Sequence, residues 1–111
     1  MRIKTQNYNN VTVVELQGEL DGDFAEQLQN TITDIISTNK TGIVLDMSSV
    51  TFIDSQGLEE LLCVRDYCNE KKCGIRLAGL DENCAKILEI TRLENEFQRY
   101  AELSEAVKSF T

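Results

Sequence analysis

A serine hydroxyl at the start of a predicted helix is the group in this sequence most suited to chemistry. Residues 46–62 read DMSSVTFIDSQGLEELL, and their apolar spacing predicts a helix that begins at Asp54 and Ser55. The first N–H groups of a helix have no partner within it. We therefore expect those of residues 56–58 to point outward, at the positive end of the helix dipole. Phosphorylation of Ser55 would place about −1.5 to −2 charges there at pH 7.

The same two residues also have a purely structural interpretation. Asp and Ser are common N-cap residues, whose side chains accept hydrogen bonds from the first turn of a helix. Asp54 would also oppose a phosphate on its neighbour through like charge. Gly57 is a poor helix former, and we expect it to let another backbone or a partner come close. Local chemistry alone leaves capping and modification of Ser55 both open.

Strands and helices alternate on either side of this segment. Residues 2–8 and 11–17 form two β-rich runs with two asparagines between them, which is typical of a hairpin. We expect a break at Gly18 and then a helix capped by Asp23. The apolar stripe of this helix consists of Phe24, Leu28, Ile32, Ile35 and Ile36.

The second half of the chain continues the alternation. The apolar run 43–47 predicts the central strand, and Gly74 is expected to stop the helix that opens at Asp54. A short strand over 75–78 follows. Apolar positions then mark a third helix, a last strand within 93–100 and a closing helix: Cys84, Ile87, Leu88, Leu103, Val107 and Phe110. We predict the α/β class, with a single domain over residues 1–111, a small mixed sheet opening with a β-hairpin, and about four helices.

The charge balance and the absence of histidine exclude several classes of function. Eleven Lys and Arg residues against nineteen Asp and Glu residues give a net charge of −8, which repels nucleic-acid phosphates and anionic lipid. We expect neither a nucleic-acid nor a membrane partner. Without histidine, every Ser-His-Asp or Cys-His arrangement is missing. The N-terminus lacks an apolar signal core, and no apolar run approaches the roughly 20 residues that span a bilayer, so we expect a cytoplasmic protein.

The four cysteines do not form a close pair. Cys63, Cys68 and Cys73 are separated by steps of five residues and Cys84 lies further on, so the Cys-x-x-Cys spacing of zinc and redox sites is absent. We expect reduced, half-buried packing residues and no metal site.

Three segments of the sequence together resemble the anti-sigma factor antagonists of the STAS domain family. They are the acidic turn GELD at 18–21, the strand IVLDMSSV at 43–50, and the motif FIDSQGL at 52–58. Segments 76–80 and 87–93 are similar to the fourth strand and third helix of that family, so the resemblance spans nearly the whole chain. The Asp-Ser-x-Gly-Leu element is fairly specific when it follows such a strand.

The resemblance implies a partner-switching protein that regulates transcription, is not an enzyme and holds no cofactor. In such proteins the unmodified form binds an anti-sigma factor that is also an ATP-dependent serine kinase, which frees a sigma factor. Phosphorylation of the motif serine ends this binding, and a PP2C-type serine phosphatase restores it. By position that serine is Ser55. Asp21 and Asp54 match acidic neighbours of the acceptor, which makes them candidates for partner contact and for repelling the phosphate.

The resemblance also places Gln56, Gly57, Leu58 and Glu59 on the partner-binding surface. Gln56 stands where the family usually has a second small hydroxyl residue, so one alternative acceptor is missing. Glu59 stands where many relatives have glycine. Together with Glu60 it is expected to add negative charge one turn from the acceptor, which restricts the kinases that can dock.

Three other interpretations stay open. A STAS-type scaffold or accessory subunit of a signalling or transport assembly would use Ser55 only as a cap. A response-regulator receiver would carry phosphate on Asp46, but the acidic pair and the lysine that it needs are not placed correctly. An enzyme using Glu19, Asp21 and Asp23 would need a converging base or a phosphate loop, and a solvated acidic surface explains these carboxylates more simply.

Overall fold

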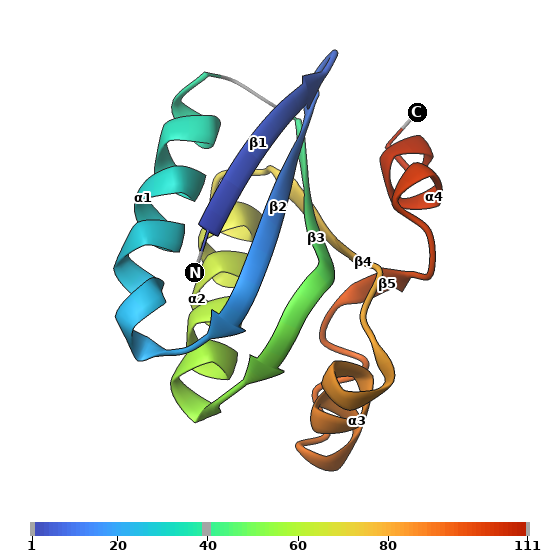
Figure 1. The fold of residues 1–111 in the computed structure, drawn as a ribbon. Coiled ribbons are helices and arrows are strands. Elements are labelled where there is room, and N and C mark those ends of the chain that lie inside the picture. Colours follow the sequence, from blue (N-terminus) through green and yellow to red (C-terminus); the bar gives the residue numbers. More distant parts are fainter. Residues whose placement is uncertain (1, 39–40, 111) are drawn as a thin grey trace.

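The chain folds into a five-stranded mixed sheet with helices packed on both faces (Figure 1). The computed structural model describes residues 2–38 and 41–110. In chain order the elements are β1 (Arg2–Tyr8), β2 (Val11–Leu20), α1 (Gly22–Ser37), β3 (Gly42–Ile53), α2 (Ser55–Glu70), β4 (Gly74–Ala78), α3 (Glu82–Ile90), β5 (Gln98–Tyr100) and α4 (Leu103–Lys108). Strand β1 is antiparallel to β2 and all other neighbours are parallel. The predicted α/β class, opening hairpin and mixed sheet are confirmed.

Alternate residues of the strands supply two apolar clusters, one on each face of the sheet. Val14, Leu16 and Leu45 belong to the larger cluster, which also contains the buried side chains of α1, α2 and α3. Val13 and Val44 belong to the smaller cluster, which is covered by α4. The period of two in a strand produces this division, so nearly every position of the two central strands is buried where helices cover both faces.

Strand β2 runs further than its sequence indicates. A break was expected at Gly18, yet the strand continues to Leu20. Gly18 has φ 112°, a conformation that favours glycine, and the pairing of β2 with β3 shifts register directly after it. The expectation was wrong because β2 accommodates Gly18 by a shift in its pairing with β3 and continues as a strand beyond it.

Strand β3 is also longer than the run 43–47 that predicted it. It extends through two exposed serines, Ser48 and Ser49, and continues to Ile53. Its pairing with β4 ends at Asp46, whereas its pairing with β2 continues to Ile53. The carboxyl ends of β2 and β3 therefore project beyond the rest of the sheet, and helices α1 and α2 begin there.

Helix α1 is capped by Asp21 and not by Asp23 as expected. The carboxylate Oδ1 of Asp21 accepts the N–H of Asp23 at 3.1 Å, and the N–H of Phe24 donates to the carbonyl oxygen of Asp21 at 3.1 Å. The helix starts at Gly22 because β2 continues to Leu20, so the next residue, Asp21, already stands at the cap position and no loop separates strand from helix.

An aromatic residue that follows α4 packs against the sheet and holds this helix in place. The ring of Phe110 lies against Gly42 and Gly74, where an added methyl group would overlap it, and the guanidinium carbon of Arg76 lies 4.3 Å from the ring centroid. None of the helices within the described residues is long and apolar enough to cross a membrane.

Candidate functional site

Ser55 is exposed at the first position of α2. Asp54 is the N-cap, and its Oδ1 accepts the N–H of Gly57 at 2.8 Å. Within residues 2–38 and 41–110, the Ser55 hydroxyl has no hydrogen-bond partner. The prediction that a helix opens at Asp54 and Ser55 is confirmed. Because Asp54 performs the capping, the serine hydroxyl is free of any structural role there.

Fewer backbone N–H groups are available to an anion than the sequence indicated. The N–H of Gly57 is bound by the Asp54 carboxylate, and the N–H of Leu58 donates to the Asp54 carbonyl oxygen at 2.9 Å. For the N–H groups of Ser55 and Gln56 the described residues offer no acceptor. The expectation of three free groups at 56–58 was wrong because the cap occupies the positive end of the helix.

The turn between β2 and α1 lies against the first turn of α2. The N–H of Asp54 donates to the carbonyl oxygen of Leu20 at 3.2 Å. A methyl group added at Gly57 would lie 2.2 Å from the same carbonyl oxygen. The amide oxygen of Gln56 lies over Gly22, where an added methyl group would overlap it. These contacts bring Asp21, which follows Leu20, next to the start of α2.

The six residues expected to bind a partner divide into two groups. Gln56 and Glu59 are exposed, and Asp21 and Asp54 are half-buried at the rim. Gly57 and Leu58 are buried beneath them. The glycine is required by the internal contact with β2, which the sequence could not distinguish from close approach by a partner.

Glu60 does not add to the exposed charge, contrary to expectation. Its side chain is 9% exposed and its Oε1 atom is buried without a hydrogen-bond partner among the described residues. Burial raises the pKa of this carboxyl above its ordinary value. Sequence reasoning missed this because two adjacent glutamates near the start of a helix look alike, although neighbouring residues on a helix point about 100° apart.

An acidic depression adjoins the β2–α1 turn. It has a volume of about 400 Å³ and is lined by Glu19, Asp21, Asp23, Phe24 and Gln27. The described part of the chain contains no group of three or more Asp, Glu, Cys or His residues arranged to hold a metal ion.

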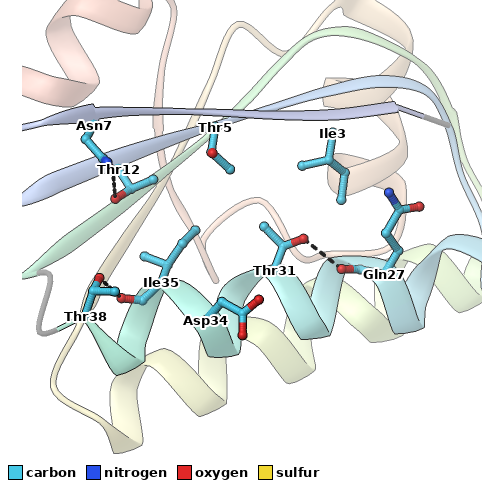
Figure 2. Close-up of a pocket in the computed structure, with 9 residues that line it drawn as sticks. All are labelled: Ile3, Thr5, Asn7, Thr12, Gln27, Thr31, Asp34, Ile35 and Thr38. Atoms are coloured by element: carbon cyan, nitrogen blue, oxygen red, sulfur yellow. Dashed lines mark hydrogen bonds between the residues drawn. The ribbon is translucent and has the colours of Figure 1, made fainter.

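A larger hollow lies between β1 and α1, away from all the predicted site residues (Figure 2). Its volume is about 550 Å³. The hydroxyl of Thr12 donates to Asn7 at 2.9 Å, while the hydroxyls of Thr31 and Thr38 donate to carbonyl oxygens of their own helix. These three hydroxyl groups donate to neighbouring protein atoms, and none of the predicted site residues lines the hollow.

Asp46, the acceptor in the receiver interpretation, lies inside β3 and not at its end. Its Oδ1 accepts the N–H and the hydroxyl of Ser48, at 3.1 and 2.8 Å. The side chain is half-buried on the face that carries α4. No acidic pair surrounds it in the described residues, so the receiver interpretation has no structural support.

Three of the four thiols are buried and packed. Cys68, Cys73 and Cys84 are buried, whereas Cys63 is exposed on α2. The N–H of Cys73 donates to the carbonyl oxygen of Cys68 at 2.8 Å, the bond that closes a Schellman motif at the end of α2. A hydrogen bond between these two thiols, together with burial, raises the pKa of Cys68, and the same bond lowers the pKa of Cys73. Burial raises the pKa of Cys84 to about 12.

Comparison with known proteins gives a consistent result. A model of the STAS domain matches residues 2–106. The anti-sigma-F factor antagonist RsfB of Mycobacterium tuberculosis is 26% identical over 106 residues, 95% of this chain and 85% of that protein. SpoIIAA in its unphosphorylated form has a TM-score of 0.82 at 21% identity, covering 98% of this chain and 96% of that one. The Bacillus cell fate determinant SpoIIAA in the phosphorylated form has a TM-score of 0.74 at 20% identity, covering 99% and 100%.

Proposed function

The chain belongs to the STAS domain family, and on this basis we propose that it is an anti-sigma factor antagonist that works by partner switching. The unmodified protein binds an anti-sigma factor with serine-kinase activity and thereby frees a sigma factor. Phosphate on Ser55 ends the binding, and a PP2C-type phosphatase removes the phosphate. Asp21, Asp54, Gln56 and Glu59 form the contact surface, with Gly57 and Leu58 shaping it from below.

The observation that carries this proposal is the exposed Ser55 hydroxyl. Asp54 caps the helix, so the serine does not. A kinase must bring the terminal phosphate of ATP against this oxygen. After transfer, the dianion on Ser55 would face nucleotide phosphates in the same complex, and like charges in a water-excluded interface repel strongly. Because only two N–H groups are open and Asp54 is adjacent, little in the chain itself neutralises the new charge.

The names of the relatives support the same proposal. RsfB is named an anti-sigma-F factor antagonist, and SpoIIAA has been solved in an unphosphorylated and in a phosphorylated form. The alternative of a scaffold or accessory subunit explained Ser55 as a helix cap. With Asp54 as the cap, this explanation no longer accounts for the serine.

The test uses a purified anti-sigma factor kinase from the same genome, with ATP. We expect one phosphate per chain, located on Ser55 by mass spectrometry and absent from Ser55→Ala. Ser104 is an exposed serine in the first turn of α4, so Ser104→Ala is the matched control and should accept phosphate as the wild type does. Phosphate on another residue, or none, would overturn the proposal.

Binding measurements separate the switch from simple phosphorylation. By calorimetry, Ser55→Ala should bind the kinase as tightly as wild type, while Ser55→Asp should bind at least about tenfold more weakly because it places an unpaired charge in the interface. Ser104→Asp adds the same charge elsewhere and should bind normally. Equal affinity of both Ser55 variants would remove the switch from the proposal.

A further inference from the structure

An aromatic side chain stands exposed three residues before the proposed acceptor. Phe52 is 49% exposed, whereas Phe24 and Phe97 are 3% and 8% exposed and Phe110 is half-buried against the sheet. Phe52 does not belong to a loose turn: it lies in β3, where it is paired with Glu19 of β2. Phe52 is one of three large apolar side chains that are exposed among the described residues, and it is the one that lies beside the proposed acceptor.

A register shift in the sheet holds Phe52 outward. Val50 pairs with Gly18 and Phe52 pairs with Glu19, so Thr51 is an extra residue in β3. In a regular strand Val50 and Phe52 would point to the same face. With the extra residue, Val50 and Ile53 are both buried, at 1% and 2% exposure, and Phe52 points to the opposite side. Such irregularities re-aim side chains next to functional sites.

The surroundings of Phe52 are strongly acidic. Its strand partner Glu19 is exposed, and Asp21 and Asp54 follow where β2 and β3 end. Between residues 5 and 64 the sequence contains ten Asp and Glu residues and a single basic residue, Lys40. A surface that docks here must therefore carry positive charge around an apolar centre.

We propose that Phe52 is the anchor by which this protein docks on its kinase partner, inserted in an apolar pocket that is rimmed by lysine or arginine side chains. This inference rests on the proposed function, because it assigns the docking surface for phosphorylation of Ser55. Buried aromatic side chains near the centre of an interface commonly dominate its binding energy. The charged rim of Glu19 and Asp21 sets the orientation in which Ser55 reaches the nucleotide.

The other large apolar side chains that are exposed among the described residues provide matched controls. They are Tyr8 at the tip of the β1–β2 hairpin, 41% exposed, and Ile90 at the end of α3, 71% exposed. Ile90 is more exposed than Phe52 and belongs to a different element, so Ile90→Ala removes a comparable apolar surface without touching the proposed docking surface.

The experiment measures binding of Phe52→Ala, Phe52→Leu and Ile90→Ala to the purified kinase, with circular dichroism as the check of folding. We expect Phe52→Ala to raise Kd at least about tenfold, Phe52→Leu to restore much of the affinity, and Ile90→Ala to bind as wild type. Raising NaCl from about 50 to about 300 mM should weaken binding of every variant, because exposed charges are screened.

The outcomes distinguish this inference from the function on which it rests. If Phe52→Ala binds as wild type while Ser55→Asp does not, Phe52 is not the docking anchor, and the proposed switch at Ser55 is retained. If binding does not respond to salt, the basic rim is wrong. If the wild-type protein neither binds nor is phosphorylated by the kinase, the proposed function fails and the docking surface fails with it.

Discussion

Replacing Gly57 with alanine tests how the site is assembled, because this residue joins the start of α2 to the end of β2. The methyl group of alanine would lie 2.2 Å from the carbonyl oxygen of Leu20 and 2.9 Å from its carbonyl carbon. Both are backbone atoms, so no rotation of a side chain can relieve the overlap. The helix must move away from the strand, and the hydrogen bond from Asp54 N–H to Leu20, now 3.2 Å, must lengthen.

Two opposing effects set the magnitude. In an exposed helix the change from glycine to alanine gains about 1 kcal/mol through helix propensity. Here the backbone overlap costs about 1–3 kcal/mol, as forced displacement in a packed core does, and loss of the hydrogen bond adds about 1 kcal/mol. The gain from propensity and the loss of the hydrogen bond nearly cancel, so we expect the free energy of unfolding to fall by about 1–3 kcal/mol, the reverse of what propensity alone predicts.

The assay is urea unfolding followed by circular dichroism, since the sequence has no tryptophan to report by fluorescence. Gly22→Ala is the matched control. A methyl group there would overlap the amide oxygen of Gln56, the far end of a flexible side chain that can rotate aside, so stability should change by less than about 0.5 kcal/mol. If Gly57→Ala is as stable as wild type or more stable, the close contact between α2 and β2 is refuted.

Two further predictions concern buried groups. Glu60→Gln should change the pH dependence of stability: burial raises the folded-state pKa of Glu60 above its unfolded value, so ionisation costs stability as pH rises from the unfolded pKa through the folded one. The variant's stability relative to wild type should therefore grow between pH 4 and pH 7 in urea unfolding, and a constant difference would contradict the burial of this carboxyl. In native protein, iodoacetamide should alkylate Cys63 alone, with Cys68, Cys73 and Cys84 reacting after unfolding; rapid labelling of two or more thiols would show that α2 and α3 do not pack as described.

The parts of the fold that depend on local pattern were predictable from the sequence. The hairpin, the start of α2 and the order of elements follow from periodicity and capping residues. The position of the candidate site in the fold was predictable for the same reason, because Asp54 and Ser55 stand directly between a strand and a helix. Periodicity did not indicate the extra residue at Thr51, since the run Val50 to Ile53 is apolar enough to fit either face of a strand.

The features that escaped prediction are set by contacts between elements far apart in the sequence. Asp21 and Asp23 are equally good caps locally, and only the length of β2 decides between them. Glu59 and Glu60 are adjacent and chemically identical, yet one is exposed and the other is buried. Gly57 lies against the Leu20 carbonyl, 37 residues earlier in the chain. No local rule carries this information, because each outcome depends on where α2 lies relative to β2.

In the proposed complex, recognition and switching use different residues of one small surface. Phe52 and Glu19 belong to the projecting ends of β3 and β2. Ser55 follows Phe52 by three residues and is the first residue of α2. A partner can therefore meet the acidic strand ends with basic side chains and still present nucleotide phosphates to the serine. Phosphate on Ser55 adds negative charge next to the phosphates of the partner's bound nucleotide. In water, two unit charges about 4 Å apart repel by only about 1 kcal/mol, small beside a folding free energy of about 5–15 kcal/mol. In a desolvated interface the same charges interact several times more strongly, so modification would break the complex and leave the fold intact.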